Sequence, residues 1–382
     1  MTWKVQLCEL NYSLEESRAV ERVISSKWLT MGDKVKKFEN KFSQFLGEKS
    51  LCSAVSSCTA ALHISILGLN LKSKDEIIMP ALTFVANANV IKLSGCKPVL
   101  ADIESLQNPN LSIETIKKVV TKKTKAVYIV HFAGFPCDVK PIAEFCKRNN
   151  IYLIEDVAHA PGASINGRNC GTFGDVSCFS FYSNKNLSTG EGGMIVTRDK
   201  KLHECFQKIR SHGMTAATLD RHKGRAYSYD VISPGLNYRF DEIKGALGLV
   251  QLSKLKRANN KRKKLSERYL KNLKNSPLML PFSQKREKFE SSHHIMPVLL
   301  PKNTNKEEVI NFLKNFGIQT SMHYPSFHNF SFYKKFFSKN KSPVSSEFIQ
   351  RELTLPLYPD LKFKEVDYVC DSIKKYFDDK NF

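Results

Sequence analysis

The sequence predicts an α/β fold in two domains, and three observations point to it. From about residue 50 to residue 200, short apolar or β-branched runs alternate with helical stretches. The runs are almost continuously apolar, which is typical of strands buried on both faces of a sheet. The chain has 382 residues and is 42% hydrophobic, enough for roughly two domains with sizeable cores. Such alternation indicates a mostly parallel sheet covered by helices.

The expected elements can be placed in order along the chain. Strands are expected at residues 76–80, 97–102, 125–131, 151–156, 177–181 and 193–197. Helices are expected between several of them, at residues 59–69, 84–93, 112–120 and 138–149. Because this alternation stops after the last strand, we assign residues 1–240 to a large α/β domain that includes an N-terminal arm.

The rest of the chain has a different pattern. A long polar helix is followed by a strand and two further helices, at residues 241–273, 294–300, 306–315 and 364–377. We therefore expect residues 241–382 to form a smaller α+β domain, with the boundary near residue 240.

The charge balance is strongly basic, with 59 Lys and Arg against 37 Asp and Glu and a net charge of +22. A basic surface can bind nucleic acid. However, the lysines are spread along the chain, and no zinc-finger or RNA-binding signature accompanies them. We therefore expect a solvated lysine-rich surface and no nucleic-acid partner. The positive electrostatic field of such a surface favours a small anionic substrate.

The ten cysteines are scattered and include no C-x-x-C pair. This pattern fits a reducing compartment and gives no metal signature. The first residues lack a basic segment followed by an apolar run, and nowhere do about 18 apolar residues follow one another. The sequence thus predicts a cytoplasmic protein with no membrane segment and no bound metal.

Two charged residues follow expected strands, where open α/β sheets bind their ligands. Asp156 ends the run at 151–156, where an acid can ligate a metal, act as a base, contact a ribose, pair with a protonated ring nitrogen or simply cap a helix. Lys185 lies between the strand at 177–181 and a glycine-rich turn, which suits a bound ligand. A lysine deprotonated by its surroundings can form a Schiff base with a carbonyl cofactor.

Small hydroxyl residues open the helix expected at 59–69. The N–H groups and the dipole at a helix N-terminus attract anions, and Ser57 and Thr59 add hydroxyl donors for a phosphate. The alternative is a plain helix cap. The chain contains no G-x-x-x-x-G-K-[ST], no G-x-G-x-x-G after a strand and no H-E-x-x-H. These absences disfavour an ATPase, a dehydrogenase and a zinc protease.

Five motifs in a fixed order give the chain a family resemblance. They are 57–62 (SCTAAL), 80–86 (PALTFVA), 155–163 (EDVAHAPGA), 180–193 (SFYSNKNLSTGEGG) and 235–239 (GLNYR). The chain resembles the DegT/DnrJ/EryC1/StrS family, which are fold-type I, pyridoxal-phosphate-dependent aminotransferases acting mainly on nucleotide-linked keto-sugars. The resemblance implies a large domain with a mostly parallel sheet of the seven-stranded type and a smaller C-terminal α+β domain.

The resemblance also implies a role for each matching cofactor residue. Lys185 matches the Schiff-base lysine, which also moves protons between substrate and cofactor. Asp156 matches the carboxylate that faces the pyridine nitrogen, where its charge favours the protonated, electron-accepting ring. Phe84 matches the aromatic that stacks on the ring, and His159 matches a residue near the phenolic oxygen.

Phosphate binding is assigned by the resemblance to Cys58, Thr59 and Ser180, together with Asn237 from the second subunit of a homodimer. The family usually has Gly where Cys58 stands. The backbone N–H survives this change, so we expect phosphate binding to persist.

Three residues match the substrate side of the family's site. His323 and Tyr324 match a loop near the sugar or nucleotide, and Arg239 follows Asn237 into the shared interface. Relatives that dehydrate sugars have His in place of the Schiff-base lysine, so Lys185 favours transamination.

The expected reaction moves an amino group from glutamate to a keto group of a nucleotide-linked deoxysugar, for surface-polysaccharide or glycan synthesis. The stretch 28–32 (WLTMG) favours C4 over C3. Two alternatives remain open. One is a relative that acts on a non-nucleotide ketone such as a cyclitol or an aminoaromatic precursor. The other is a non-catalytic binding or regulatory protein on the same fold, against which the presence of both Lys185 and Asp156 argues.

Overall fold

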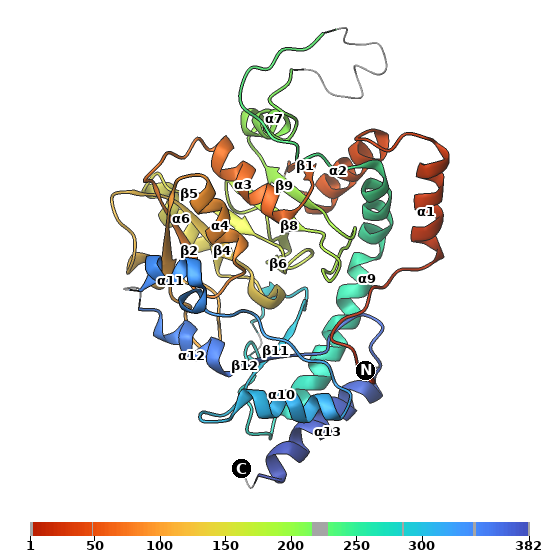
Figure 1. Ribbon diagram of the computed structural model, residues 1–382, viewed down its shortest axis with the longest axis vertical. Helices are drawn as coiled ribbons and strands as arrows, with labels where there is room; N and C mark the ends of the chain where they lie inside the picture. The colour runs from red at the N-terminus through yellow and green to blue at the C-terminus, as the bar shows by residue number, and fades with distance from the viewer. Residues whose placement is uncertain (1–2, 48, 216–227, 285, 339–340, 381–382) are drawn as a thin grey trace.

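The computed structural model describes residues 3–47, 49–215, 228–284, 286–338 and 341–380. Figure 1 shows a central sheet surrounded by helices, with a smaller C-terminal part below it and the long helix α9 running between the two. Among the described residues, no helix combines the length and the apolar character needed to cross a membrane.

The central sheet has seven strands. In spatial order they are β1 (Leu51–Val55), β9 (Gly193–Thr197), β8 (Val176–Ser180), β5 (Tyr152–Asp156), β4 (Thr124–Val130), β2 (Glu76–Pro80) and β3 (Lys97–Ala101). β9 runs antiparallel to both of its neighbours, whereas the pairs from β8 to β3 are parallel. β2, β8 and β9 are buried along their whole length. This sheet confirms the predicted fold class.

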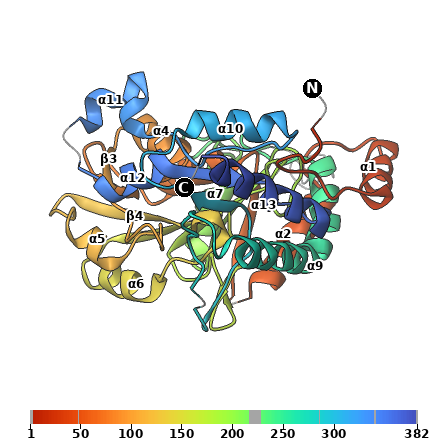
Figure 2. The same ribbon diagram turned by 90° about the horizontal axis from the view of Figure 1, so that it is seen from below.

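Helices cover both faces of the sheet. They are α3 (Cys58–Gly68), α4 (Ala86–Leu93), α5 (Ile113–Lys117), α6 (Val139–Arg148) and α7 (Lys200–Ile209). The apolar residues of α3, α4 and α7 share one core cluster, and those of α5 and α6 share another. Figure 2 shows α4 on one side of the sheet and α5 and α6 on the other. Both faces are therefore shielded from water, as the apolar strand sequences require.

The N-terminal helices pack beside the sheet. α1 (Leu14–Ser25) and α2 (Asp33–Leu46) both contact α9 (Glu242–Leu273). Phe38 and Phe42 of α2 are fully buried and meet Phe179 and Phe181 at ring-centroid distances of 5.0 to 5.6 Å. This aromatic cluster supports the chain on both sides of Ser180, at the point where β8 ends.

The C-terminal part has its own core. Its elements are β11 (Met296–Leu299), α10 (Lys306–Asn315), β12 (Glu352–Leu355) and α13 (Phe363–Asp378). The last turns of α9 join this core, and β11 pairs with β12 antiparallel. Val5 also joins it through a bridge to Ile318. Of the other two C-terminal helices, α11 (Ser331–Phe337) packs on the core that contains α3 and α4, and α12 (Pro343–Arg351) packs on Phe132. The short elements are β6 (Ser164–Ile165), β7 (Arg168–Asn169), β10 (Phe289–Glu290), η1 (Phe132–Gly134) and η2 (Phe327–Asn329).

The structure contains several elements that the sequence pattern did not predict. β1 and β12 are short strands with buried polar residues, Ser53 in the first and Glu352 and Thr354 in the second, which interrupt the apolar run. α1, α2, α7, α11 and α12 were also missed. α9 begins at Glu242, two residues past the boundary expected near residue 240, and the division into two domains stays a prediction.

Candidate active site

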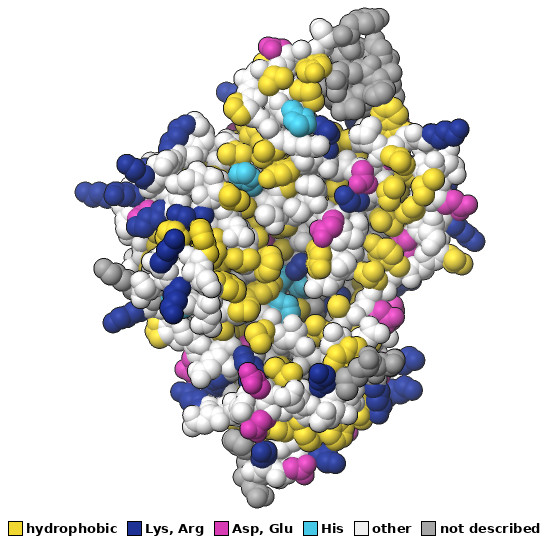
Figure 3. Space-filling view, viewed as in Figure 1, with side chains coloured by type: hydrophobic (Ala, Val, Ile, Leu, Met, Phe, Trp, Pro, Cys, Tyr) yellow, Lys and Arg dark blue, Asp and Glu magenta, His cyan; other side chains and the backbone are white. Residues whose placement is uncertain are grey.

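A cavity of about 410 Å³ opens where β5 and β8 end and α3 begins. It brings together nine of the predicted site residues, which are Cys58, Thr59, Phe84, Asp156, His159, Ser180, Lys185, His323 and Tyr324. Figure 3 shows the surface hollowed at the centre of this face, with histidine side chains gathered in the hollow. The residues come from segments up to 266 positions apart in sequence, between Cys58 and Tyr324.

Two predicted site residues do not line this cavity. Asn237 is exposed and forms an isolated bridge with Ser211, and Arg239 forms one with Val55 at the end of β1. Both were assigned to an interface with a second subunit. That assignment stays a prediction.

Lys185 lies in the turn that follows β8, where its N–H donates to the carbonyl of Tyr182 at 2.9 Å. Burial of the amine lowers the pKa of Lys185 to about 8, although the negative charge of Asp156 opposes the shift. About a tenth of this amine is therefore neutral at pH 7, far more than for an exposed lysine. A neutral amine can act as a nucleophile or a base.

Asp156 ends β5, and two donors hold its carboxylate. The N–H of Ala158 donates to Oδ1 at 3.0 Å, and Nδ2 of Asn87 donates to Oδ2 at 3.0 Å. Burial raises the pKa of Asp156, while these two hydrogen bonds and the charge of Lys185 oppose the rise. The carboxylate is thus fixed in orientation at the cavity wall.

The first turn of α3 forms another wall of the cavity. Ser57 caps the helix, and its Oγ accepts the N–H of Ala60 at 3.0 Å. Cys58 and Thr59 follow as the first helical residues. A Cβ on Gly193 would meet Cys58 N at 2.6 Å, so glycine allows β9 to start directly against this turn. The N-terminus of α3 can hold an anion in the cavity.

His159 and Tyr324 form a hydrogen-bonded pair in the cavity. Nδ1 of His159 accepts the backbone N–H of Ala133 at 3.3 Å, so the ring proton lies on Nε2. This Nε2–H donates to the Tyr324 hydroxyl oxygen at 2.7 Å. Burial and the charge of Lys185 keep the pKa of His159 well below its usual range. The Tyr324 O–H therefore remains available to donate to a ligand.

The comparisons with known proteins agree with this geometry. Residues 12–374 match the DegT/DnrJ/EryC1/StrS aminotransferase family. The chain belongs to this family. A GDP-perosamine synthase of Escherichia coli O157:H7 is 33% identical over 367 residues, 96% of each chain. The spore coat polysaccharide biosynthesis protein SpsC of Bacillus subtilis is 35% identical over 376 residues, again 96% of each.

A solved structure extends the similarity to three dimensions. Helicobacter pylori PseC, an aminotransferase involved in the biosynthesis of pseudoaminic acid, superposes with a TM-score of 0.92 at 30% identity. The match covers 99% of this chain and 100% of that one. The protein is therefore a pyridoxal-phosphate-dependent sugar aminotransferase, as the ordered motifs predicted.

The cavity residues fit pyridoxal phosphate. The α3 N-terminus suits its phosphate, the Lys185 amine suits its aldehyde, and the Asp156 carboxylate suits its ring nitrogen. The Phe84 ring borders the cavity and remains 55% exposed. The buried Oδ1 of Asn184 lines the same cavity and has no hydrogen-bond partner among the described residues, which leaves an acceptor for a ligand.

Among the polar residues that sequence reasoning missed, two contact the predicted Asp156 and Lys185. Asn87 donates to Asp156, and His294 Nε2 lies 3.4 Å from Lys185 Nζ. Asn87 is completely buried in α4, within a segment where only Phe84 was singled out. The pair of histidines before the strand at 296–299 was the signal that could have led to His294.

A buried carboxylate behind the cavity supports His323. Glu352 Oε2 accepts the His323 N–H at 2.8 Å, and Thr354 Oγ1 links Glu352 Oε1 to His323 Nδ1. Burial raises the pKa of Glu352 to about 7, against the hydrogen bonds from Thr354 and His323 and the charge of Lys306. Glu352 therefore changes charge near neutral pH.

This pKa gives a prediction for stability. Between pH 4.5 and 7 the unfolded chain loses the Glu352 proton while the folded protein keeps it, so folding stability falls as pH rises. We expect a loss of about 3 kcal/mol over this range that Glu352→Gln abolishes. Urea unfolding of both proteins at pH 5 and pH 8 measures it. An equal free-energy difference between them at both pH values would contradict the prediction.

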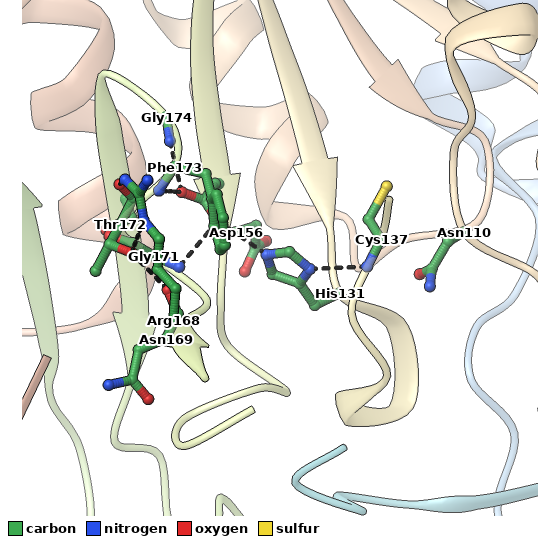
Figure 4. A network of polar contacts seen from close by, with 12 residues as sticks. Asn110, His131, Cys137, Asp156, Arg168, Asn169, Gly171, Thr172, Phe173 and Gly174 are labelled. Atoms are coloured by element: carbon green, nitrogen blue, oxygen red, sulfur yellow. Dashed lines mark hydrogen bonds and ion pairs between the residues drawn. The ribbon is translucent and has the colours of Figure 1, made fainter. Parts of the chain in front are cut away.

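A second buried carboxylate holds the strand that carries Asp156. Glu155 accepts the N–H groups of Gly171, Phe173 and Gly174 at 2.7 to 2.8 Å, and His131 Nε2 lies 3.1 Å from it. Figure 4 shows these groups converging from the turn after β7 and from the end of β4. His131 Nδ1 accepts the N–H of Cys137 at 3.0 Å, so His131 donates from Nε2. The network ties together the segments on both sides of β5.

Burial by itself would raise the pKa of Glu155, but the bonds from His131 and the backbone outweigh it and lower the pKa. We expect Glu155→Gln to cost about 3 kcal/mol of folding free energy, because its NH₂ group would face backbone donors. Urea unfolding at pH 7 measures the loss, with the exposed Glu144→Gln on α6 as the control. Equal stability of the two variants would refute this account.

Proposed function

We propose that this enzyme transfers the amino group of glutamate to C4 of a nucleotide-linked keto-deoxysugar. We further propose that it does so as a cytoplasmic homodimer, in the synthesis of a surface polysaccharide or another glycan. One observation carries the proposal: a Lys185 amine with a pKa of about 8 shares a cavity with Asp156 and the α3 N-terminus. The free thiols of all ten cysteines support a reducing compartment.

The cofactor residues divide the work by chemistry. When bound, pyridoxal phosphate supplies an aldehyde that bonds to amines and a ring that accepts electrons. The N–H groups at Cys58 and Thr59, with the Ser180 hydroxyl, would hold the phosphate. Asp156 would keep a negative charge at the ring nitrogen, and Phe84 would cover a ring face.

Lys185 performs the proton transfers. Its amine removes a proton from the carbon of the amino donor, and its ammonium form returns a proton in the second half of the reaction. A pKa of about 8 suits both tasks, because both protonation states are present near neutral pH. His159 donates to Tyr324 and thereby keeps the hydroxyl proton of Tyr324 directed at other partners.

Residues of the cavity wall, residues expected from a second subunit, the names of relatives and the net charge support the proposed nucleotide-linked sugar substrate. His323 and Tyr324 lie in the cavity wall and would contact the sugar or nucleotide. Asn237, completing the phosphate site, and Arg239 would enter from the second subunit. The relatives named GDP-perosamine synthase support a nucleotide-linked sugar, and the net charge of +22 is compatible with a diphosphate. The stretch 28–32 supports C4.

A product screen tests the proposal. The enzyme, loaded with cofactor, is incubated with glutamate and with GDP-, UDP- and dTDP-linked 4-keto- and 3-keto-deoxysugars, and scyllo-inosose serves as the non-nucleotide ketone. Mass spectrometry detects amination, and NMR locates the new amine. We expect a 4-amino nucleotide sugar and stoichiometric 2-oxoglutarate. Amination of scyllo-inosose alone, or of no ketone, would overturn the proposal.

A further inference from the structure

A histidine with no assigned role lies within hydrogen-bond distance of the Lys185 amine. His294 Nε2 lies 3.4 Å from Lys185 Nζ, and His294 is 97% buried, with a relative exposure of 3%. It precedes β11 in the C-terminal part, and Arg262 donates to its backbone carbonyl at 3.0 Å. A residue from the C-terminal part of the chain thus reaches the amine that lines the cavity.

A chain of amide groups fixes which nitrogen of His294 carries the proton. Asn259 Nδ2 donates to the carbonyl of Pro161 at 2.9 Å, which orients Asn259 Oδ1 as an acceptor. Asn186 Nδ2 donates to this oxygen at 2.9 Å and to the carbonyl of Ser292 at 2.8 Å. Asn186 Oδ1 therefore faces His294 Nδ1, at 2.8 Å. Because an amide oxygen only accepts, Nδ1 must carry the proton.

The other ring nitrogen is then a pure acceptor. With the proton on Nδ1, Nε2 of the neutral ring presents a lone pair to the Lys185 amine. Burial, with the charges of Lys185 and Arg262 and the neighbouring His159 and His323, holds the pKa of His294 well below its usual range. The ring therefore stays neutral over the working pH range and does not compete for protons as a charged group.

We propose that His294 is a positioning residue for Lys185, whose Nε2 accepts a hydrogen bond from the lysine amine whenever that amine is not bonded to the cofactor. The inference rests on the proposed role of Lys185. A lysine side chain has four rotatable bonds, and the Asp156 charge attracts its ammonium. A fixed acceptor reduces this freedom and keeps the amine ready for the cofactor aldehyde. Asn186 orients His294 directly, and Asn259 orients Asn186.

The test uses cofactor-free protein and the rate at which Lys185 captures pyridoxal phosphate. The rate is followed by absorbance and confirmed by borohydride trapping and peptide mass spectrometry. His294→Asn keeps a donor near the Nδ1 position but loses the acceptor, whereas His294→Gln places an amide near the Nε2 position. We expect capture to slow about tenfold in His294→Asn and to recover to within about threefold of wild type in His294→Gln. His293→Asn, beside it in sequence, is the matched control.

The possible outcomes distinguish a failure of the proposed role of Lys185 from a failure of the proposed role of His294. Trapping of the cofactor at a residue other than Lys185 in the wild type would overturn the proposed function. Trapping at Lys185 with equal capture rates in the wild type, His294→Asn and His294→Gln would overturn only the role of His294. A lowered melting temperature of His294→Asn with a normal capture rate would show a structural role and would also reject the proposal. Should His294→Asn not fold, ¹⁵N-histidine NMR of the wild type decides, since a proton on Nε2 would contradict the proposal.

Discussion

Replacement of Lys185 by alanine will lower kcat on the order of 10⁴-fold, because the substitution removes the residue proposed to be both the covalent attachment point and the acid–base group. Cofactor-free protein will still bind pyridoxal phosphate through the α3 N-terminus and Asp156, but borohydride will no longer fix the cofactor to the chain. Steady-state kinetics and mass spectrometry after reduction measure the two effects. Lys201→Ala, an exposed lysine of α7, is the matched control.

The pH dependence of the wild type sharpens this prediction. Only the neutral amine attacks an aldehyde, so capture of pyridoxal phosphate by cofactor-free protein will rise with pH up to about 8 and then level off.

Added methylamine will restore part of the kcat of Lys185→Ala, because a small neutral amine can enter the space left by the side chain. Turnover of Lys185→Ala near the wild-type rate, or cofactor fixed to the chain after reduction, would contradict the assignment.

Two charged residues of the site could be predicted from the sequence because each follows a recognisable buried strand. Asp156 closes a buried apolar run, and Lys185 follows another before a glycine-rich turn. In a parallel sheet these ends meet at one edge, so both residues could be placed at a single cavity without the structure. The family resemblance then supplied Phe84, His159 and Tyr324, and the cavity contains all three.

The supporting residues could not be predicted in this way, because their roles depend on contacts between distant segments. Asn186 and Asn259 matter only because Asn186 meets His294 across 108 positions and Asn259 across 73. Glu352 lies in a strand whose polar residues interrupt the apolar run by which a buried strand is recognised. Its carboxyl group has a raised pKa because the surrounding chain buries it. Such effects arise from tertiary packing and leave no periodic signal in the sequence.

Substitution of Asp156 by asparagine is the change with the next largest expected effect. The variant keeps the volume of the side chain and an oxygen that can accept from Ala158 or Asn87, but it loses the charge that we propose faces the ring nitrogen. The protein should still fold, because Asn87 Oδ1 is buried without a hydrogen-bond partner among the described residues. A turned Asn87 amide can offer that oxygen to the new NH₂ group. The substitution therefore isolates charge from packing.

We expect Asp156→Asn to lower kcat about 10²-fold or more, which corresponds to roughly 3 kcal/mol, the upper range for a hydrogen bond to a charged group. KM for the amino donor should change little, since the lost interaction strengthens as electrons move onto the ring. Steady-state kinetics and the absorbance of the bound cofactor report the two effects. Asp199→Asn is the control, because asparagine caps α7 as well as aspartate does. A kcat within about threefold of wild type would mean that the ring needs no negative charge at this position, and that the buried carboxylate serves only to hold β5 and α4 together.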